Sequence, residues 1–129
     1  MPVASQLKVM VVDDTSVSRM LLADGLTQIG VTNVTMTKDG EECLKSMMAA
    51  PCHIVLSDFN MPKLDGLQLL RALREYAPLK QVGFILVTGR GDKALIDQAR
   101  VYGLNNYLPK PFTVPSLKAT LEAVVGKLT

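Results

Sequence analysis

Short apolar runs, separated by longer segments with helical periodicity, constrain the fold of this chain most strongly. Residues 9–12, 54–56 and 84–87 are apolar throughout. Strands of this kind are typical of a parallel sheet that helices cover on both faces, because neither face of the strand meets water. Alternation of such strands with helices predicts βα units. We therefore predict an α/β fold in which five βα units form a doubly wound three-layer sandwich.

The expected elements follow from periodicity and from turn residues. We expect strands at 8–12, 34–37, 54–57, 84–87 and 106–108, and helices at 16–29, from Gly40 to Pro51, after Gly66, at 93–102 and after Thr113. The side chains expected to face the core are, helix by helix, Val17, Leu21, Leu22, Leu26 and Ile29; Leu44, Met47 and Met48; Leu69, Leu70 and Leu73; Leu95, Ile96 and Ala99; Leu117, Leu121, Val124 and Leu128. The fourth helix has the weakest apolar face, so we expect it to be among the more mobile elements.

Size and composition narrow the class of protein. With 129 residues, 48% hydrophobic and 20% charged, the chain fits a single folded domain over 1–129 and is too short for a second module of similar size. A net charge of +2 does not by itself indicate a nucleic acid or a membrane as partner, and no apolar run is long enough to span a bilayer. We expect a monomer in the cytoplasm. Cys43 and Cys52 lack metal-ligand spacing and are expected to be reduced, buried thiols, and His53 to be structural.

Polar side chains stand where the apolar strands end. Asp13 and Asp14 follow the first strand, Asp58 follows the third, Thr88 the fourth and Lys110 the fifth. Ligands of open α/β sheets bind outside the carboxyl ends of the strands, so these residues are expected to meet at one edge. Carboxylates, a hydroxyl and an ammonium group suit a magnesium-assisted phosphoryl transfer onto an aspartate.

Each residue of this group also has an ordinary interpretation when it is taken alone. Asp13 or Asp14 could cap the next helix, Asp58 could be a turn aspartate and Thr88 a strand residue. Lys110 could be a solvated loop lysine, although Pro109 and Pro111 on either side suggest that its ammonium group is aimed, and the bond before Pro111 is a candidate for the cis form. Crowding three aspartates without a cation is electrostatically costly, so the group as a whole favours a metal site.

The combination of motifs resembles response-regulator receiver domains, in particular the free-standing chemotaxis regulators. The resemblance covers nearly the whole chain and rests on residues 9–14, 57–66, 87–89 and 110–112. It implies a flavodoxin-like fold with the parallel strand order 2-1-3-4-5. It also implies a single receiver domain over 1–129 with no output domain, Mg²⁺ as cofactor, and a protein that is not a conventional enzyme but catalyses its own phosphorylation and dephosphorylation.

The resemblance also implies roles for individual residues. Asp58 resembles the phospho-acceptor, Asp14 a direct Mg²⁺ ligand, Asp13 a ligand that acts largely through water, and Asn60 a ligand through its main-chain carbonyl. Thr88, Lys110 and the backbone amide of Gly89 would stabilise the phosphoryl group, and Thr88 and Tyr107 match the switch positions. Arg90 and Phe59 depart from the pattern of the best-known chemotaxis regulator, and their effect near the site is open.

Partners follow from the same resemblance. The phosphodonor would be a sensor histidine kinase of a bacterial two-component system, and the output would leave through the fourth helix, fifth strand and fifth helix. A flagellar motor switch protein is the expected downstream partner. A phosphate sink that drains the kinase, or an adaptor that ignores phosphorylation, are the alternatives. A dehalogenase-type phosphatase fits poorly because its first-strand acids are spaced as Asp-x-Asp, and a flavin module fits poorly because the first loop is acidic.

Overall fold

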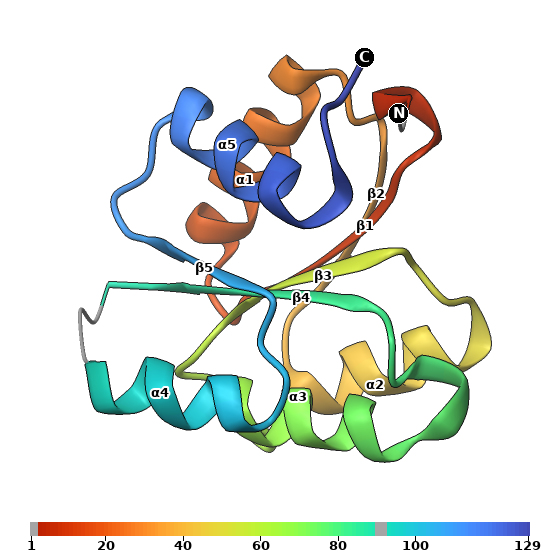
Figure 1. Cartoon of the computed structure of the whole chain (residues 1–129), viewed down its shortest axis with the longest axis vertical. Helices are drawn as coiled ribbons and strands as arrows, with labels where there is room; N and C mark the ends of the chain where they lie inside the picture. The colour runs from red at the N-terminus through yellow and green to blue at the C-terminus, as the bar shows by residue number, and fades with distance from the viewer. Residues whose placement is uncertain (1–2, 90–92) are drawn as a thin grey trace.

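The computed structural model describes residues 3–89 and 93–129. Strands and helices alternate along the chain in the predicted way (Figure 1). The strands are β1 (Lys8–Val12), β2 (Asn33–Thr37), β3 (Ile54–Asp58), β4 (Gly83–Thr88) and β5 (Asn106–Pro109), and the helices are α1 (Ser16–Ile29), α2 (Gly40–Ala49), α3 (Gly66–Glu75), α4 (Lys93–Val101) and α5 (Val114–Val125). Two short 3-10 helices, η1 (Ala4–Gln6) and η2 (Ala77–Leu79), precede β1 and β4.

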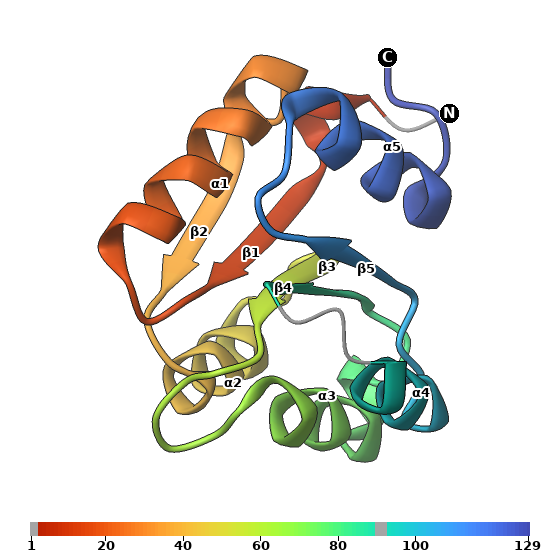
Figure 2. The same ribbon diagram turned by 90° about the vertical axis from the view of Figure 1, so that its left-hand side faces the viewer.

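The strands form one parallel sheet in the order β2-β1-β3-β4-β5, as predicted. Helices α1 and α5 cover one face, and α2, α3 and α4 cover the other (Figures 1 and 2). The chain therefore has the flavodoxin-like, doubly wound architecture. None of the described helices is long and apolar enough to cross a membrane.

Two apolar cores lie on the two faces of the sheet. Because successive side chains of a strand point to opposite faces, the inner strands contribute to both cores. In β1, Val9 and Val11 pack with α1 and α5, whereas Met10 and Val12 pack with α2 and α3. All four side chains are fully buried, which is why the run is apolar without alternation.

Capping interactions define where several helices begin. Asp65 and Gln68 form a reciprocal capping box at the start of α3, and Thr113 with Ser116 does the same for α5. Asp39 accepts a hydrogen bond from the amide of Glu42 at the start of α2. At the other end of α1, Gly30 adopts a φ of 103°, a left-handed conformation that favours glycine. The peptide bond between Lys110 and Pro111, which the sequence made a candidate for the cis form, is cis.

Three side chains of the predicted core are exposed instead. Val17 and Leu21 of α1 are 71% and 57% exposed, and Met48 of α2 is 49% exposed. Apolar residues occur on several sides of α1, so periodicity alone does not show which of them face the sheet. In the structure, Leu22 and Leu26 face it and are buried. Leu128 is buried as expected, but α5 ends at Val125 and Leu128 reaches the core from the segment that follows.

Candidate functional site

Three aspartates meet at the carboxyl ends of β1 and β3. Asp13 and Asp14 directly follow β1, and Asp58 is the last residue of β3. Oxygen atoms of the three carboxylates lie within 4.8 Å of one another. Asp13 is fully buried, Asp58 is partly buried and Asp14 is exposed, so the group forms a cluster that opens to solvent on one side. Such a set of hard oxygen donors suits Mg²⁺ or Ca²⁺ better than a soft metal.

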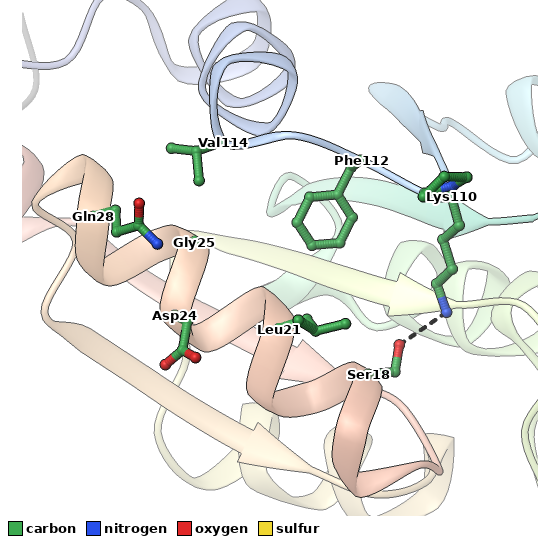
Figure 3. A pocket seen from close by; sticks show the side chains of 9 residues that line it. Ser18, Leu21, Asp24, Gly25, Gln28, Lys110, Phe112 and Val114 are labelled. Carbon is green, nitrogen blue, oxygen red and sulfur yellow. Dashed lines mark hydrogen bonds between the residues drawn. The ribbon is translucent and has the colours of Figure 1, made fainter.

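The ammonium group of Lys110 reaches this cluster from the segment after β5. Its Nζ lies 3.2 Å from Oδ2 of Asp13 and 3.5 Å from Oδ1 of Asp58. It also donates a hydrogen bond of 3.0 Å to Oγ of Ser18 on α1 (Figure 3). The side chain of Lys110 is 27% exposed. It is therefore a bound lysine rather than a solvated loop residue.

Asp13 is held from several sides. Its Oδ1 accepts hydrogen bonds from the amide and the hydroxyl of Thr15, at 3.0 and 3.1 Å, and its main-chain oxygen accepts one of 2.7 Å from Nη1 of Arg19. Burial by itself would raise the pKa of Asp13, but hydrogen bonds from Ser18 and Thr15 and the charge of Lys110 outweigh it, so the pKa of this carboxyl is lowered. The carboxylate is thus held ionised.

Neither Asp13 nor Asp14 occupies the N-cap of α1, because that position is Thr15. The interpretation that Asp13 or Asp14 is the N-cap residue of this helix is therefore wrong. The two carboxylates face the strand edge together with Asp58 instead.

Asp58 has the opposite electrostatic tendency. Its Oδ1 accepts a hydrogen bond of 2.9 Å from the amide of Phe59. Burial raises the pKa of Asp58; Lys110 opposes this, while the neighbouring charge of Asp13 adds to it. Negative charge at Asp58 is therefore disfavoured in this structure, as expected where carboxylates outnumber the ammonium group that pairs with them.

The loop between β3 and α3 is held close to Asp58. The amide of Gly66 donates a hydrogen bond of 2.8 Å to the oxygen of Phe59, and Ser57 Oγ donates one of 2.8 Å to the oxygen of Asp58. Asn60 lies in this loop and is exposed, and Phe59 packs against the core beneath α2, α3 and α4. The metal-binding role of the Asn60 carbonyl stays a prediction.

The remaining predicted site residues lie on β4 and β5 or directly after them. Thr88 ends β4, is 2% exposed, and accepts a hydrogen bond of 2.9 Å from the amide of Lys110 through its main-chain oxygen. Gly89 follows and is exposed. Tyr107 pairs with Leu86 across the two strands and packs, half-buried, against the core that contains α4. Arg90 lies outside the described residues.

The structure adds three residues that the sequence did not single out. Thr15 and Arg19 hold Asp13, and Ser18 holds Lys110. Thr15 is the N-cap of α1, and Ser18 and Arg19 lie on its first turns, so their contacts depend on how this helix packs at the edge of the sheet. A polar residue at position 18, between apolar neighbours at 17 and 20 to 22, was the available signal.

Comparison with known proteins identifies the class to which this fold and site belong. Residues 9–122 match the family model of the response regulator receiver domain, so the chain belongs to the response regulator receiver family. It is 48% identical to the probable chemotaxis protein CheY of Rhizobium etli over 99% of both chains. It is 36% identical to chemotaxis protein CheY1 of Helicobacter pylori over 93% of this chain and 98% of that one.

Solved structures agree with the sequence relatives. Vibrio cholerae chemotaxis protein CheY4 superposes with a TM-score of 0.85 at 28% identity, over 92% of this chain and 98% of that one. The chain is accordingly a receiver domain of the CheY-like chemotaxis type.

Proposed function

We propose that this receiver accepts a phosphoryl group on Asp58 from the phosphohistidine of a sensor histidine kinase. The observation that carries the proposal is the meeting of three carboxylates with the Lys110 ammonium group at the carboxyl edge of the sheet. During phosphoryl transfer, negative charge is spread over the oxygens of the phosphoryl group, and the cations and hydrogen-bond donors that stabilise this charge must already be in place. The similarity to chemotaxis regulators supports the same assignment.

The residues present fit a bound Mg²⁺ ion. The three carboxylates carry more negative charge than the Lys110 ammonium neutralises, and their oxygens are close enough to share one cation. Asp13, Asp14, Asp58 and the main-chain carbonyl of Asn60 would hold it. When bound, Mg²⁺ would neutralise charge on the phosphoryl oxygens and on the acceptor carboxylate.

The transfer itself needs little chemistry from the protein. A carboxylate oxygen of Asp58 attacks phosphorus in line, the phosphorus–nitrogen bond breaks, and the leaving imidazole keeps the bonding electron pair and takes up a proton. Lys110 and the amide of Gly89 would stabilise the charge on the equatorial oxygens. The result is an acyl phosphate on Asp58.

Phosphorylation would then change the output face. The phosphoryl group adds roughly −1.5 to −2 charge and strong acceptors beside Thr88, whose hydroxyl can bond to it. We propose that Thr88, Tyr107 and α4 move together, because Tyr107 packs into the same core as Leu95 and Ala99 of α4. Relaxation-dispersion NMR of α4 with and without a phosphoryl mimic tests this coupling, and unchanged dynamics would refute it.

The output is binding to a downstream protein through the face formed by α4, β5 and α5, with a flagellar motor switch protein as the proposed partner. A pull-down with the motor protein distinguishes three possible outputs: a motor-binding regulator, a phosphate sink and an adaptor that does not depend on phosphorylation. Binding that rises with a phosphoryl mimic supports the motor assignment. Phosphorylation without any change in motor binding favours a phosphate sink, and binding that persists unchanged in Asp58→Asn favours an adaptor.

Phosphotransfer from a purified, autophosphorylated histidine kinase tests the proposed reaction. Label should move from the kinase to this chain within seconds to minutes, and Asp58→Asn should leave it on the kinase. Transfer to Asp58→Asn at the parent rate would place the acceptor elsewhere.

A further inference from the structure

Among the residues that the structure describes, three oxygen atoms lie close to the Lys110 ammonium group, and one of them belongs to a neutral side chain. Nζ lies 3.0 Å from Oγ of Ser18, 3.2 Å from Oδ2 of Asp13 and 3.5 Å from Oδ1 of Asp58. An ammonium group has three N–H donors, so it can address all three oxygens at once. The hydroxyl is the nearest of the three partners.

Ser18 is well placed to hold this group. Ser18 belongs to α1. The next residue, Arg19, donates a hydrogen bond of 2.7 Å to the main-chain oxygen of Asp13 and so fixes this turn of the helix beside the acidic cluster. In Figure 3 the Ser18 hydroxyl points from α1 toward the lysine, which descends from the segment after β5. The two residues come from opposite ends of the chain, so their contact depends on the finished fold.

The side of Lys110 away from the acids is open. Ser18 and Lys110 both line a cavity of about 530 Å³ between α1 and the start of α5, whose walls include Leu21, Gly25 and Phe112. A lysine side chain has four rotatable bonds and loses considerable entropy when it is held in one position. Without the hydroxyl, the ammonium group would have room to swing toward this cavity and solvent.

The two charged partners of Lys110 are the carboxylates proposed to bind a divalent cation. A cation shared by Asp13 and Asp58 would weaken their attraction for the ammonium group and would repel it directly. The Ser18 hydroxyl carries no net charge and is not among the proposed metal ligands. It also hydrogen-bonds to Asp13, but its bond to Lys110 does not join the ammonium group to a proposed metal ligand, so metal binding should weaken this bond least of the three.

We propose that Ser18 is a positioning residue that keeps the Lys110 ammonium group at the acidic cluster when a divalent cation engages Asp13 and Asp58. This inference rests on the proposed function, because a lysine held in this way is useful only if it meets a phosphoryl group there. It predicts a role for Ser18 that depends on metal and on Lys110, which a purely structural serine would not show.

The first test observes the lysine directly. Proton–nitrogen NMR of the lysine side-chain ammonium groups, with Lys110→Met to assign the signal, reports how fast the Lys110 protons exchange with water. Without Mg²⁺, Ser18→Ala should change this exchange little, because both carboxylates still hold the group. With saturating Mg²⁺, exchange in Ser18→Ala should be about tenfold faster than in the parent, a typical effect of losing one hydrogen bond to a charged group.

Ser18→Thr is the matched control, since it keeps the hydroxyl. It should restore slow exchange in the presence of Mg²⁺, and both variants should unfold at nearly the parent temperature. Equal exchange in Ser18→Ala and the parent with Mg²⁺, or a parent signal that Mg²⁺ itself abolishes, would overturn the inference. None of these readouts requires that the protein be phosphorylated.

Phosphorylation rate supplies the second test and separates the two proposals. Ser18→Ala should slow phosphorylation by a small donor about tenfold in the parent background and should have no further effect in Lys110→Met. An equal slowing in both backgrounds would overturn the positioning role. A parent chain that takes up no phosphoryl group would instead refute the proposed function, while the exchange measurement still decides the inference.

Discussion

A β-carbon on Gly66 would lie 2.7 Å from the main-chain oxygen of Asp58. The first residue of α3 thus packs directly against the strand end that carries the proposed phospho-acceptor. The amide of Gly66 reinforces this contact through its hydrogen bond of 2.8 Å to the oxygen of Phe59. Position 66 therefore requires glycine because of space, and the loop geometry beside Asp58 depends on it.

Gly66→Ala should disturb both stability and the site. The added methyl group meets backbone rather than a flexible side chain, so the loop must shift, and we expect a loss of about 1–3 kcal/mol in the free energy of unfolding. Affinity for Mg²⁺ should fall as well. Urea unfolding and a Mg²⁺ titration measure the two effects. Gly89→Ala is the control for stability, because a β-carbon there would lie 4.0 Å from Cβ of Lys110, which is an ordinary contact.

Asp58→Asn should make the protein more stable near neutral pH when metal is absent. The pKa of Asp58 is raised from 3.8 chiefly by burial, so the folded state favours the neutral form. Its contribution to stability is present below pH 3.8 and is lost as pH rises through the raised pKa. The neutral amide avoids this loss. Urea unfolding in a chelator between pH 3 and 7 should show a gain at pH 7 that shrinks on acidification; a variant less stable than the parent at pH 7 would contradict it.

Asp13→Asn should act in the opposite direction. The pKa of Asp13 is lowered from 3.8, so its ionised form stabilises the fold above that pH, and this contribution is lost as pH falls through the lowered pKa. The variant also removes the charge that pairs with Lys110 at 3.2 Å. We expect a loss of about 1–3 kcal/mol at pH 7 that diminishes in acid, measured in the same series. Equal behaviour of the two asparagine variants would refute the electrostatic account of the cluster.

Much of the fold could be predicted from the sequence, for a physical reason. Strands buried on both faces are apolar without interruption, and the capping residues Asp65 and Thr113 start helices through local hydrogen bonds. The inward face of α1 was less predictable, because Val17 and Leu21 are apolar yet exposed and their exposure depends on how the helix lies on the sheet. Local patterns carry no information about that orientation.

The site likewise contains some residues that the sequence could predict and others that it could not. Asp13, Asp58 and Lys110 follow strands and could be placed at one edge by the rule for open α/β sheets. Ser18 and Arg19 could not, because their contacts join side chains of α1 to groups that approach from other elements. Contacts of that kind follow from the finished packing rather than from spacing along the chain.

Arg74 should contribute more to stability than its neighbour Arg71 one turn earlier on α3. The Arg74 guanidinium donates hydrogen bonds to the main-chain oxygens of Val82 and Gly103, at 2.7 and 2.9 Å, and to Oδ1 of Asn105 at 3.0 Å. It thus joins α3 to the segments before β4 and after α4. We expect Arg74→Ala to cost about 2–3 kcal/mol, and Arg74→Lys to recover little of it, because an ammonium group lacks the forked geometry.

Arg71→Ala is the matched control for Arg74. Both side chains of its ion pair with Glu75 are exposed, and the Cζ atom of Arg71 lies 5.7 Å from the centroid of the Tyr102 ring. The expected cost is below about 1 kcal/mol. Denaturant unfolding compares the two variants, and equal losses would contradict the account of Arg74.

The thiol of Cys43 should be unreactive in the folded protein. It is fully buried, and burial raises its pKa from 9.0 to about 12. Alkylation at pH 8, followed by intact mass, should label it only after unfolding. Because the folded state favours the neutral thiol, its contribution to stability is intact below pH 9.0 and declines as pH rises toward 12, by up to about 1.4 kcal/mol per pH unit. Rapid labelling of Cys43 in the native protein would contradict its burial.

The central claim, that Asp58 accepts a phosphoryl group with the help of a divalent cation, is tested most directly by intact mass. The parent chain, Asp58→Asn, and the parent with Mg²⁺ chelated are each incubated with a small phosphodonor. The account predicts the addition of one phosphoryl group to the parent with Mg²⁺, and none in the other two samples. Addition to Asp58→Asn, or no addition to a folded parent chain at any Mg²⁺ concentration, would contradict it.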